Sequence, residues 1–235
     1  MRKPWVWMLT AAALALMLAG CGQEPQNLPE SEPETVLPAE SEAEQVSQMP
    51  TPDPQDLVFV AVTDYIPEIR IDLKYATEDN FTGEIIYEFS TVYLRYGTVE
   101  KLAAVQEDLR QLGLGLKIWD GFRPVSAQYR LWEVCPDSTF VANPETGFSS
   151  HSTGNTVDVT LVDSEGREVQ MPTGFDDFSA LADRDYSDCS ETAANNARIL
   201  EALMEKHGFS GYSKEWWHYT DTESYPVEEA FQPTR

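Results

Sequence analysis

The chain has 235 residues, of which 42% are hydrophobic, and its formal net charge is −24. A protein this acidic repels phosphate groups, so we expect no nucleic-acid partner. The length allows one sizeable folded domain with additional segments.

The first 21 residues are predicted to form the signal peptide of a lipoprotein. Arg2 and Lys3 precede an apolar run that is too short to span a bilayer with margin and that ends in small residues. The sequence LAGC, ending at Cys21, follows the lipobox pattern in which the cysteine carries lipid. The signal peptide and the lipobox together predict an exported protein that is anchored by lipid to the cell membrane on its extracytoplasmic side. An ordinary cleaved signal with an incidental cysteine is the alternative.

Residues 22–56 are predicted to be a disordered acidic tether. The segment contains nine acidic residues, no Lys or Arg, and seven of the 15 prolines of the chain. Such a composition cannot bury enough apolar surface to offset the entropy cost of folding. The folded domain is therefore expected at 57–235. It carries a net charge of −17, because the signal peptide contributes +2 and the tether −9.

In the first half of this domain, the pattern predicts three extended segments and two helices. The apolar run 57–62 and the alternating segment 68–76 indicate strands. Thr98 can cap a helix that Gly113 ends, and its apolar residues recur at helical spacing. A short buried strand at 116–119 follows, and Pro124 can begin a second helix that extends to about Val134.

The second half adds a hairpin, a helix and a final strand. Residues 156–162 and 167–171 flank the turn DSEG, which predicts a hairpin. Ser190 can cap a third helix that Gly208 ends, and His207 at its last turn fits a structural role. The segment 211–220 indicates a turn and then a strand. Helices and hairpins without a regular βαβ alternation predict an α+β fold, with a small antiparallel central sheet flanked by helices.

Cys135 and Cys189 are the two cysteines of the predicted domain. An exported location permits a disulfide between them, but the spacing does not show whether they lie within reach. Both possibilities stay open.

Two of the three histidines have a carboxylate nearby in the sequence, within or directly before an apolar stretch. His151 precedes Asp158 in SSHSTGNTVDVTL (149–161), and Glu215 precedes His218 in EWWH. An aspartate inside a buried strand is costly unless it is paired or binds a metal. His151, Asp158 and His218 would form a three-ligand site with an open position, as catalytic zinc requires, and Glu215 could then act as general base. Two structural histidines in the core are the alternative.

Arg123 lies in WDGFRP (119–124), between a predicted strand and a predicted helix. A fixed guanidinium near a metal could stabilise the oxyanion of a tetrahedral intermediate. A plain salt bridge to Asp120 is the alternative.

Five motifs together resemble one family. They are KYATEDNFTG (74–83), WDGFRP (119–124), SSHSTGNTVDVTL (149–161), MPTGFDDF (171–178) and EWWHY (215–219). They occur in the order found in D-alanyl-D-alanine dipeptidases of the VanX type, which are zinc peptidases related to the D,D-carboxypeptidases. The resemblance covers nearly all of 57–235.

The resemblance implies one Zn²⁺ per chain, placed at the sheet, and a role for each matching residue. His151, Asp158 and His218 match the zinc ligands. Glu215 matches the catalytic base, and Arg123 matches the arginine that stabilises the transition state. The substrate-binding positions correspond to Tyr75, Ser149 and Asp176.

The function implied is hydrolysis of D-alanyl-D-alanine to two D-alanines at the extracytoplasmic side of the envelope. Two alternatives stay open: a D,D-carboxypeptidase that trims terminal D-alanine from peptidoglycan stem peptides, and a non-catalytic zinc-bearing module that binds wall peptides. Thr156 and Pro172 stand where the family usually has alanine and glycine. Strict selectivity for the dipeptide is therefore open as well.

Overall fold

The computed structural model describes residues 53–234. The predicted signal peptide (1–21), its Cys21 and the tether as far as residue 52 lie outside the described residues. Residues 53–56 form a turn in which the Asp56 amide donates to the Asp53 carbonyl oxygen at 2.9 Å. Within 53–234, none of the helices has the length and apolar character needed to cross a membrane.

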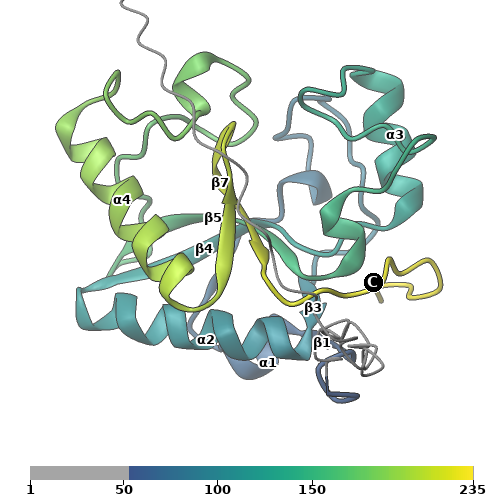
Figure 1. Ribbon diagram of the computed structural model, residues 1–235, viewed down its shortest axis with the longest axis horizontal. Helices are drawn as coiled ribbons and strands as arrows, with labels where there is room; N and C mark the ends of the chain where they lie inside the picture. The colour runs from purple at the N-terminus through teal and green to yellow at the C-terminus, as the bar shows by residue number, and fades with distance from the viewer. Residues whose placement is uncertain (1–52, 235) are drawn as a thin grey trace, which may run out of the picture. The chain divides into compact units, whose positions relative to one another are not determined.

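A five-stranded sheet with the order β2-β4-β5-β7-β6 forms the centre of the fold (Figure 1). The strands are β2 (Arg70–Ile71), β4 (Leu114–Asp120), β5 (Thr156–Asp163), β6 (Phe209–Tyr212) and β7 (Glu215–Asp221). All neighbouring strands are antiparallel except β2, which is parallel to β4. A second sheet pairs β1 (Phe59–Ala61) with β3 (Tyr93–Arg95). The predicted α+β class is confirmed, with β2 as a parallel exception.

The helices are α1 (Val62–Tyr65), α2 (Tyr96–Gln111), α3 (Val125–Val134) and α4 (Glu191–Lys206). Helices α2 and α4 pack against each other and against the sheet, whereas α3 lies apart from them (Figure 1). Three short 3-10 helices cover 74–76, 150–153 and 180–182. The layer of α2 and α4 thus leaves the ends of β4, β5 and β7 accessible to the loops that carry the predicted motifs.

Helix α4 forms where the sequence predicts it. The Ser190 hydroxyl accepts a hydrogen bond from the Ala193 amide and so satisfies one of the free donors at the helix start. Leu200 and Met204 are fully buried against the core. The helix ends at His207, and Gly208 follows with a φ of +84°, a conformation that favours glycine.

Helix α2 begins earlier than predicted, at Tyr96, and Thr98 is not its cap. Thr98 is instead fully buried within the helix, where its hydroxyl donates to the Asp221 carboxylate at 2.9 Å. Asp221 is itself buried on β7, so it needs this donor and the contact from Lys101. A long-range partner for Thr98 has therefore replaced the local one.

Of the predicted strands, 167–171 is absent, and 68–76 is much shorter than predicted. Residues 167–171 form no strand, and only an isolated bridge joins Val162 to Glu168. The Asp163 carboxylate closes this turn by accepting from the amides of residues 165 and 167. In 68–76, only Arg70–Ile71 is a strand, because the chain then turns into the 3-10 helix at 74–76.

The strands β3 and β6 were not predicted, because each has at most four residues and so carries little periodicity.

Cys135 and Cys189 are both free thiols, which resolves the open question of their disulfide.

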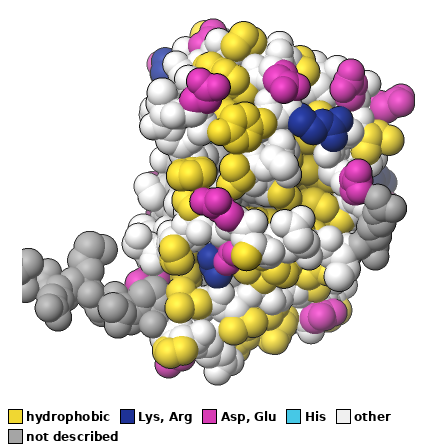
Figure 2. Space-filling view, turned by 90° about the vertical axis from the view of Figure 1, so that its right-hand side faces the viewer, with side chains coloured by type: hydrophobic (Ala, Val, Ile, Leu, Met, Phe, Trp, Pro, Cys, Tyr) yellow, Lys and Arg dark blue, Asp and Glu magenta, His cyan; other side chains and the backbone are white. Residues whose placement is uncertain are grey.

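Figure 2 shows one face of the molecule, where acidic side chains are scattered among few basic ones.

Candidate active site and metal centre

The structure brings the three predicted metal ligands together. One ligand atom from each of His151, Asp158 and His218 lies within 4.8 Å of the other two. His151 Nε2 is 3.3 Å from Asp158 Oδ2, and His218 Nδ1 is 3.1 Å from Asp158 Oδ1. Asp158 of β5 pairs directly with His218 of β7, so the sheet register itself places these two side chains side by side.

His151 is oriented by the loop that precedes β5. The Ser149 hydroxyl caps the 3-10 helix at 150–153 by accepting from the His151 amide at 3.3 Å. His151 Nδ1 lies 2.9 Å from the carbonyl oxygen of Gly121. A carbonyl can only accept, so Nδ1 carries the proton and Nε2 is left with a free lone pair toward Asp158.

Asp158 fits a metal better than it fits the core. Its Oδ1 atom is buried and accepts no hydrogen bond from the described residues, although His218 Nδ1 lies nearby. A buried carboxylate oxygen without a donor is costly, and a cation would remove that cost. Two imidazoles and one carboxylate are the donor set of catalytic zinc. The residues present therefore fit Zn²⁺, and the alternative of two structural histidines leaves Oδ1 unexplained.

Glu215 lies at the start of β7, beside the ligand cluster. Its Oε2 atom is 3.5 Å from His218 Nδ1. Burial raises the pKa of Glu215 to about 7. A carboxyl group with a pKa near neutral can both take up and release a proton, which is what a general base that later acts as acid must do.

Arg123 is held in a fixed position by Asp120. Its Nε and Nη2 atoms both donate to Asp120 Oδ2, at 3.2 and 2.7 Å, and its Nη1 donates to Gln128 at 2.8 Å. The other oxygen of Asp120 accepts from Tyr87 at 2.8 Å. The proposed salt bridge to Asp120 is thus real. This salt bridge does not exclude a role for Arg123 in stabilising an oxyanion, because Arg123 also lines the cavity described next.

A cavity of about 210 Å³ contains the candidate chemistry. Its walls include Arg123, Ser149, His151, Glu215 and His218, together with residues of the 138–142 segment and Tyr212. Asp158 does not line the cavity, although its carboxylate lies 3.3 Å from His151 Nε2 and 3.1 Å from His218 Nδ1. The site is therefore a hollow with a carboxylate, two imidazoles and a guanidinium on its wall.

Tyr75 and Asp176 form a pair that does not line this cavity, and Asp176 lines a separate one together with Trp119 and Phe175. The Tyr75 hydroxyl donates to Asp176 Oδ2 at 2.8 Å, and the Arg123 guanidinium lies 5.2 Å from the centre of the Tyr75 ring. Burial raises the pKa of Asp176 well above its usual value, and the nearby charge of Asp158 adds to the effect. Asp176 also has a φ of +53°, which is uncommon for a residue other than glycine. The fold therefore holds a poorly solvated carboxyl group on a strained stretch of backbone, close enough to Asp158, Arg123 and Glu215 to be affected by their charges.

Asp120, Tyr87, Gln128 and Tyr212 are site residues that the sequence analysis did not assign. Asp120 appeared only as a possible partner of Arg123, and nothing in the local pattern marks the others. Tyr212 packs edge-on against the His218 ring, with ring centres 5.9 Å apart. Thr156 is fully buried and bonds to Thr220 across β5 and β7 at 3.0 Å.

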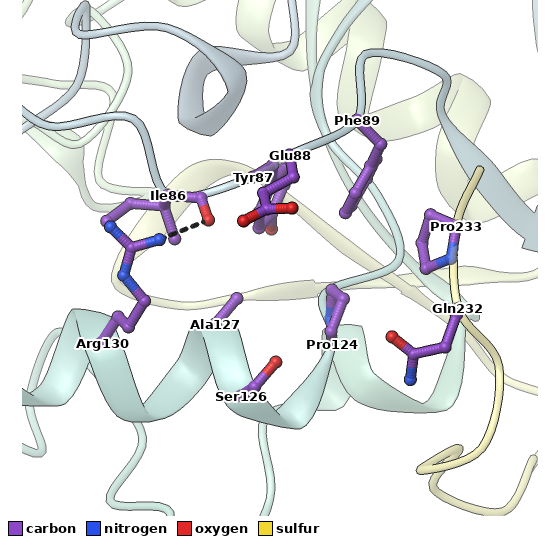
Figure 3. A pocket seen from close by; sticks show the side chains of 10 residues that line it. All are labelled: Ile86, Tyr87, Glu88, Phe89, Pro124, Ser126, Ala127, Arg130, Gln232 and Pro233. Carbon is purple, nitrogen blue, oxygen red and sulfur yellow. Dashed lines mark hydrogen bonds between the residues drawn. The ribbon is translucent and has the colours of Figure 1, made fainter. Parts of the chain in front are cut away.

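A second cavity, of about 290 Å³, lies between the segment 86–89, the start of α3 and the chain near residue 232 (Figure 3). Tyr87 forms part of its wall, and Arg130 reaches across to the carbonyl oxygen of Ile86 at 2.9 Å. None of the predicted ligands lines it. The chemistry therefore belongs to the smaller cavity, although this one is larger.

Comparison with known proteins identifies the family. The family model Peptidase_M15, described as D-ala-D-ala dipeptidase, matches residues 55–233. The chain belongs to this family. It is 37% identical over 177 residues to the D-alanyl-D-alanine dipeptidase of Escherichia coli K12, a match that covers 74% of this chain and 90% of that one. The corresponding protein of Enterococcus faecium is 32% identical over 192 residues, covering 73% and 95%.

One solved structure also resembles this chain, with a TM-score of 0.38 and 18% sequence identity. It is a Zn(II) complex of a mutant vancomycin-resistance D,D-pentapeptidase, VanY, and the match covers 58% of this chain and 76% of that one.

Membership in the Peptidase_M15 dipeptidase family confirms the predicted resemblance, and with it the enzyme class of zinc metallopeptidase. The cluster of His151, Asp158 and His218 provides a place for the metal. This membership favours the enzyme over the non-catalytic binding module. His207, as expected, has a structural position at the end of α4, where its Nε2 lies 2.7 Å from Asp108.

Proposed function

We propose that the chain hydrolyses D-alanyl-D-alanine to two D-alanines, with zinc held by His151, Asp158 and His218. The observation that carries this proposal is that His151, His218 and Glu215 share one cavity wall, while the Asp158 ligand atom lies within 4.8 Å of those of the two histidines. The proteins that match most of the chain have the same activity in their names.

In the proposed mechanism, zinc, when bound, supplies Lewis-acid polarisation of the scissile carbonyl and of the attacking water. Glu215 takes a proton from that water as the water oxygen bonds to the carbonyl carbon. Glu215 then gives the proton to the nitrogen of the leaving D-alanine as the C–N bond breaks. Arg123, fixed by Asp120, contributes positive charge where the carbonyl oxygen becomes negative.

The enzyme would distinguish a dipeptide from longer peptides at the amino-terminal end of the substrate. Asp176 is positioned by Tyr75 and could pair with the free ammonium of a dipeptide, while Ser149 on the cavity wall could bind the peptide backbone or its carboxylate. A longer peptide has an amide at that place and would leave the half-buried, poorly solvated carboxylate without its ion pair. This arrangement favours the dipeptidase over the D,D-carboxypeptidase.

The test compares two substrates and two metal states. The full-length chain, purified in detergent with zinc, should release D-alanine from D-alanyl-D-alanine and little from a pentapeptide stem that ends in D-Ala-D-Ala. A chelator should abolish the release, and added zinc should restore it, because the fold supplies three ligands and leaves a position open. Release mainly from the pentapeptide would favour the carboxypeptidase and contradict the proposed role of Asp176.

We propose further that the enzyme is anchored by lipid on Cys21 and acts outside the cytoplasm on wall-derived fragments. The support is the sequence LAGC after a short apolar run, followed by an acidic, proline-rich segment. Fractionation of cells that express the full chain should find it in the membrane fraction, and the Cys21→Ser variant should lose lipid labelling and leave that fraction. A strictly cytoplasmic wild-type protein would contradict this proposal.

A further inference from the structure

Glu215 and His218 lie in a part of β7 that the sheet supports poorly. In the β6–β7 hairpin, Gly211 pairs with Tyr219, whereas the next residue, Tyr212, pairs with Glu215. Residues 216–218 are therefore extra on β7 and have no counterpart on β6. On its other side, β7 pairs with β5 only from residue 218 onward. The backbone between the proposed base and the proposed ligand thus has few partners in the sheet.

Arg184 supplies the missing partners. Its Nη2 atom donates to the carbonyl oxygens of Trp216 and His218, at 3.2 and 3.0 Å, and its Nε donates to that of Tyr212 at 2.9 Å. One guanidinium thereby bridges both strands of the hairpin across the irregular register. The planar fork of an arginine can make these contacts together, and a lysine ammonium cannot reproduce their geometry.

Arg184 is itself firmly held. Its Nη1 atom lies 3.1 Å from a Glu201 carboxylate oxygen on α4 and 3.1 Å from the Tyr219 hydroxyl. The guanidinium carbon lies 4.5 Å from the centre of the Tyr219 ring. The hairpin is thus tied through Arg184 to helix α4, which packs on the core (Figure 1).

Gly211 provides the space for this contact. A Cβ atom at position 211 would lie 2.3 Å from the Arg184 guanidinium carbon and 2.4 Å from its Nη2. Any residue larger than glycine would therefore push the guanidinium away from the hairpin. Arg184 and Gly211 fit each other, and neither belongs to the motifs on which the family resemblance rests.

We infer that Arg184 is a positioning residue for the metal centre: by binding the carbonyl oxygens around the irregular register of β7, it fixes Glu215 and His218 relative to Asp158. The inference rests on the proposed function where turnover is concerned, and on the fold alone where zinc binding is concerned. Loss of the guanidinium leaves carbonyl groups without donors and loosens the segment that carries the base and one ligand.

The test uses Arg184→Lys and Gly211→Ala in the full-length chain. For both variants we expect kcat per zinc-loaded site to fall about 10- to 100-fold with little change in KM, because a small displacement of catalytic groups costs this much. We also expect zinc affinity, measured by competition with a chelating dye, to weaken about 10-fold. Arg167→Lys is the matched control, because Arg167 is exposed and pairs with Asp163 and Glu165 away from the site, and it should behave as wild type.

A purely structural role gives a different pattern, namely a lower melting temperature with unchanged zinc affinity and unchanged kcat per loaded site, and this result would overturn the inference. Should both variants fail to fold, Glu201→Gln weakens the hold on Arg184 from a half-buried position on α4 and should still lower zinc affinity by a few-fold. Unchanged zinc affinity in Glu201→Gln would then contradict the inference that Arg184 positions the metal centre. The zinc measurement needs no substrate, so it separates this inference from any failure of the dipeptidase proposal.

Discussion

Replacing Glu215 by glutamine is expected to lower kcat for D-alanyl-D-alanine by about 10²- to 10⁴-fold, the usual contribution of a general acid–base group. Glutamine keeps the size and shape of the side chain but cannot accept a proton at neutral pH. The prediction follows from the place of Glu215 on the cavity wall beside His218, and from the burial that raises its pKa to about 7. The measurement is steady-state release of D-alanine at saturating dipeptide.

Zinc binding separates this role from that of a ligand. Glu215 is not one of the three clustered ligand atoms, so the Glu215→Gln protein should still hold one zinc per chain. His151→Ala should lose both zinc and turnover, because it removes a ligand. Glu165→Gln, in the turn after β5, alters an exposed carboxylate and should leave both quantities unchanged. A Glu215→Gln protein with wild-type turnover would exclude Glu215 as the base.

The sequence analysis found the metal cluster because its residues are rare and chemically distinctive. The chain has three histidines, and two of them have a carboxylate nearby in the sequence, within or directly before an apolar stretch. The structure adds what those patterns do not contain, namely that Asp158 and His218 are direct neighbours in the sheet register. A local pattern can name candidate ligands, but pairing between strands that are 60 residues apart decides whether they meet.

The residues that support the site were harder to find, because their role depends on long-range contacts. Gln128 and Tyr87 look like ordinary residues of a helix and a loop, yet they help to fix Arg123 and Asp120. Arg184 comes from a segment without any motif, and its partners lie about 30 residues further along the chain. Thr98 shows the same principle in the fold, since a distant aspartate overrides its local tendency to cap a helix.

Asp176 is expected to make the protein less stable and more selective at the same time. Burial raises the pKa of its carboxyl group, so the folded protein keeps this proton to a higher pH than the unfolded chain does. Stability is therefore lost as the pH rises from the unfolded pKa toward the folded pKa. Asparagine removes that loss and tolerates the positive φ of this position. We predict that Asp176→Asn melts at a higher temperature than wild type at pH 7–8, and that the difference disappears near pH 3.

The same substitution should damage dipeptide recognition. Truncating one partner of a buried charge pair costs about 2–5 kcal/mol, which corresponds to roughly 30- to 5,000-fold in kcat/KM. The loss should be specific to substrates with a free ammonium at that end, so the ratio of dipeptide to tripeptide hydrolysis should fall in Asp176→Asn. Asp177→Asn is the control, because the adjacent Asp177 carboxylate accepts a local hydrogen bond from the Ser179 amide.

These two effects have one physical origin. A carboxyl group that is poorly solvated before the substrate arrives is stabilised as an anion when an ammonium pairs with it, and the fold bears the desolvation cost in the free enzyme. The affinity for the dipeptide should accordingly increase as the pH rises and Asp176 ionises, until the substrate ammonium itself loses its proton near pH 8. An Asp176→Asn protein that is no more stable than wild type, and that keeps its preference for the dipeptide, would show that Asp176 has no part in recognition.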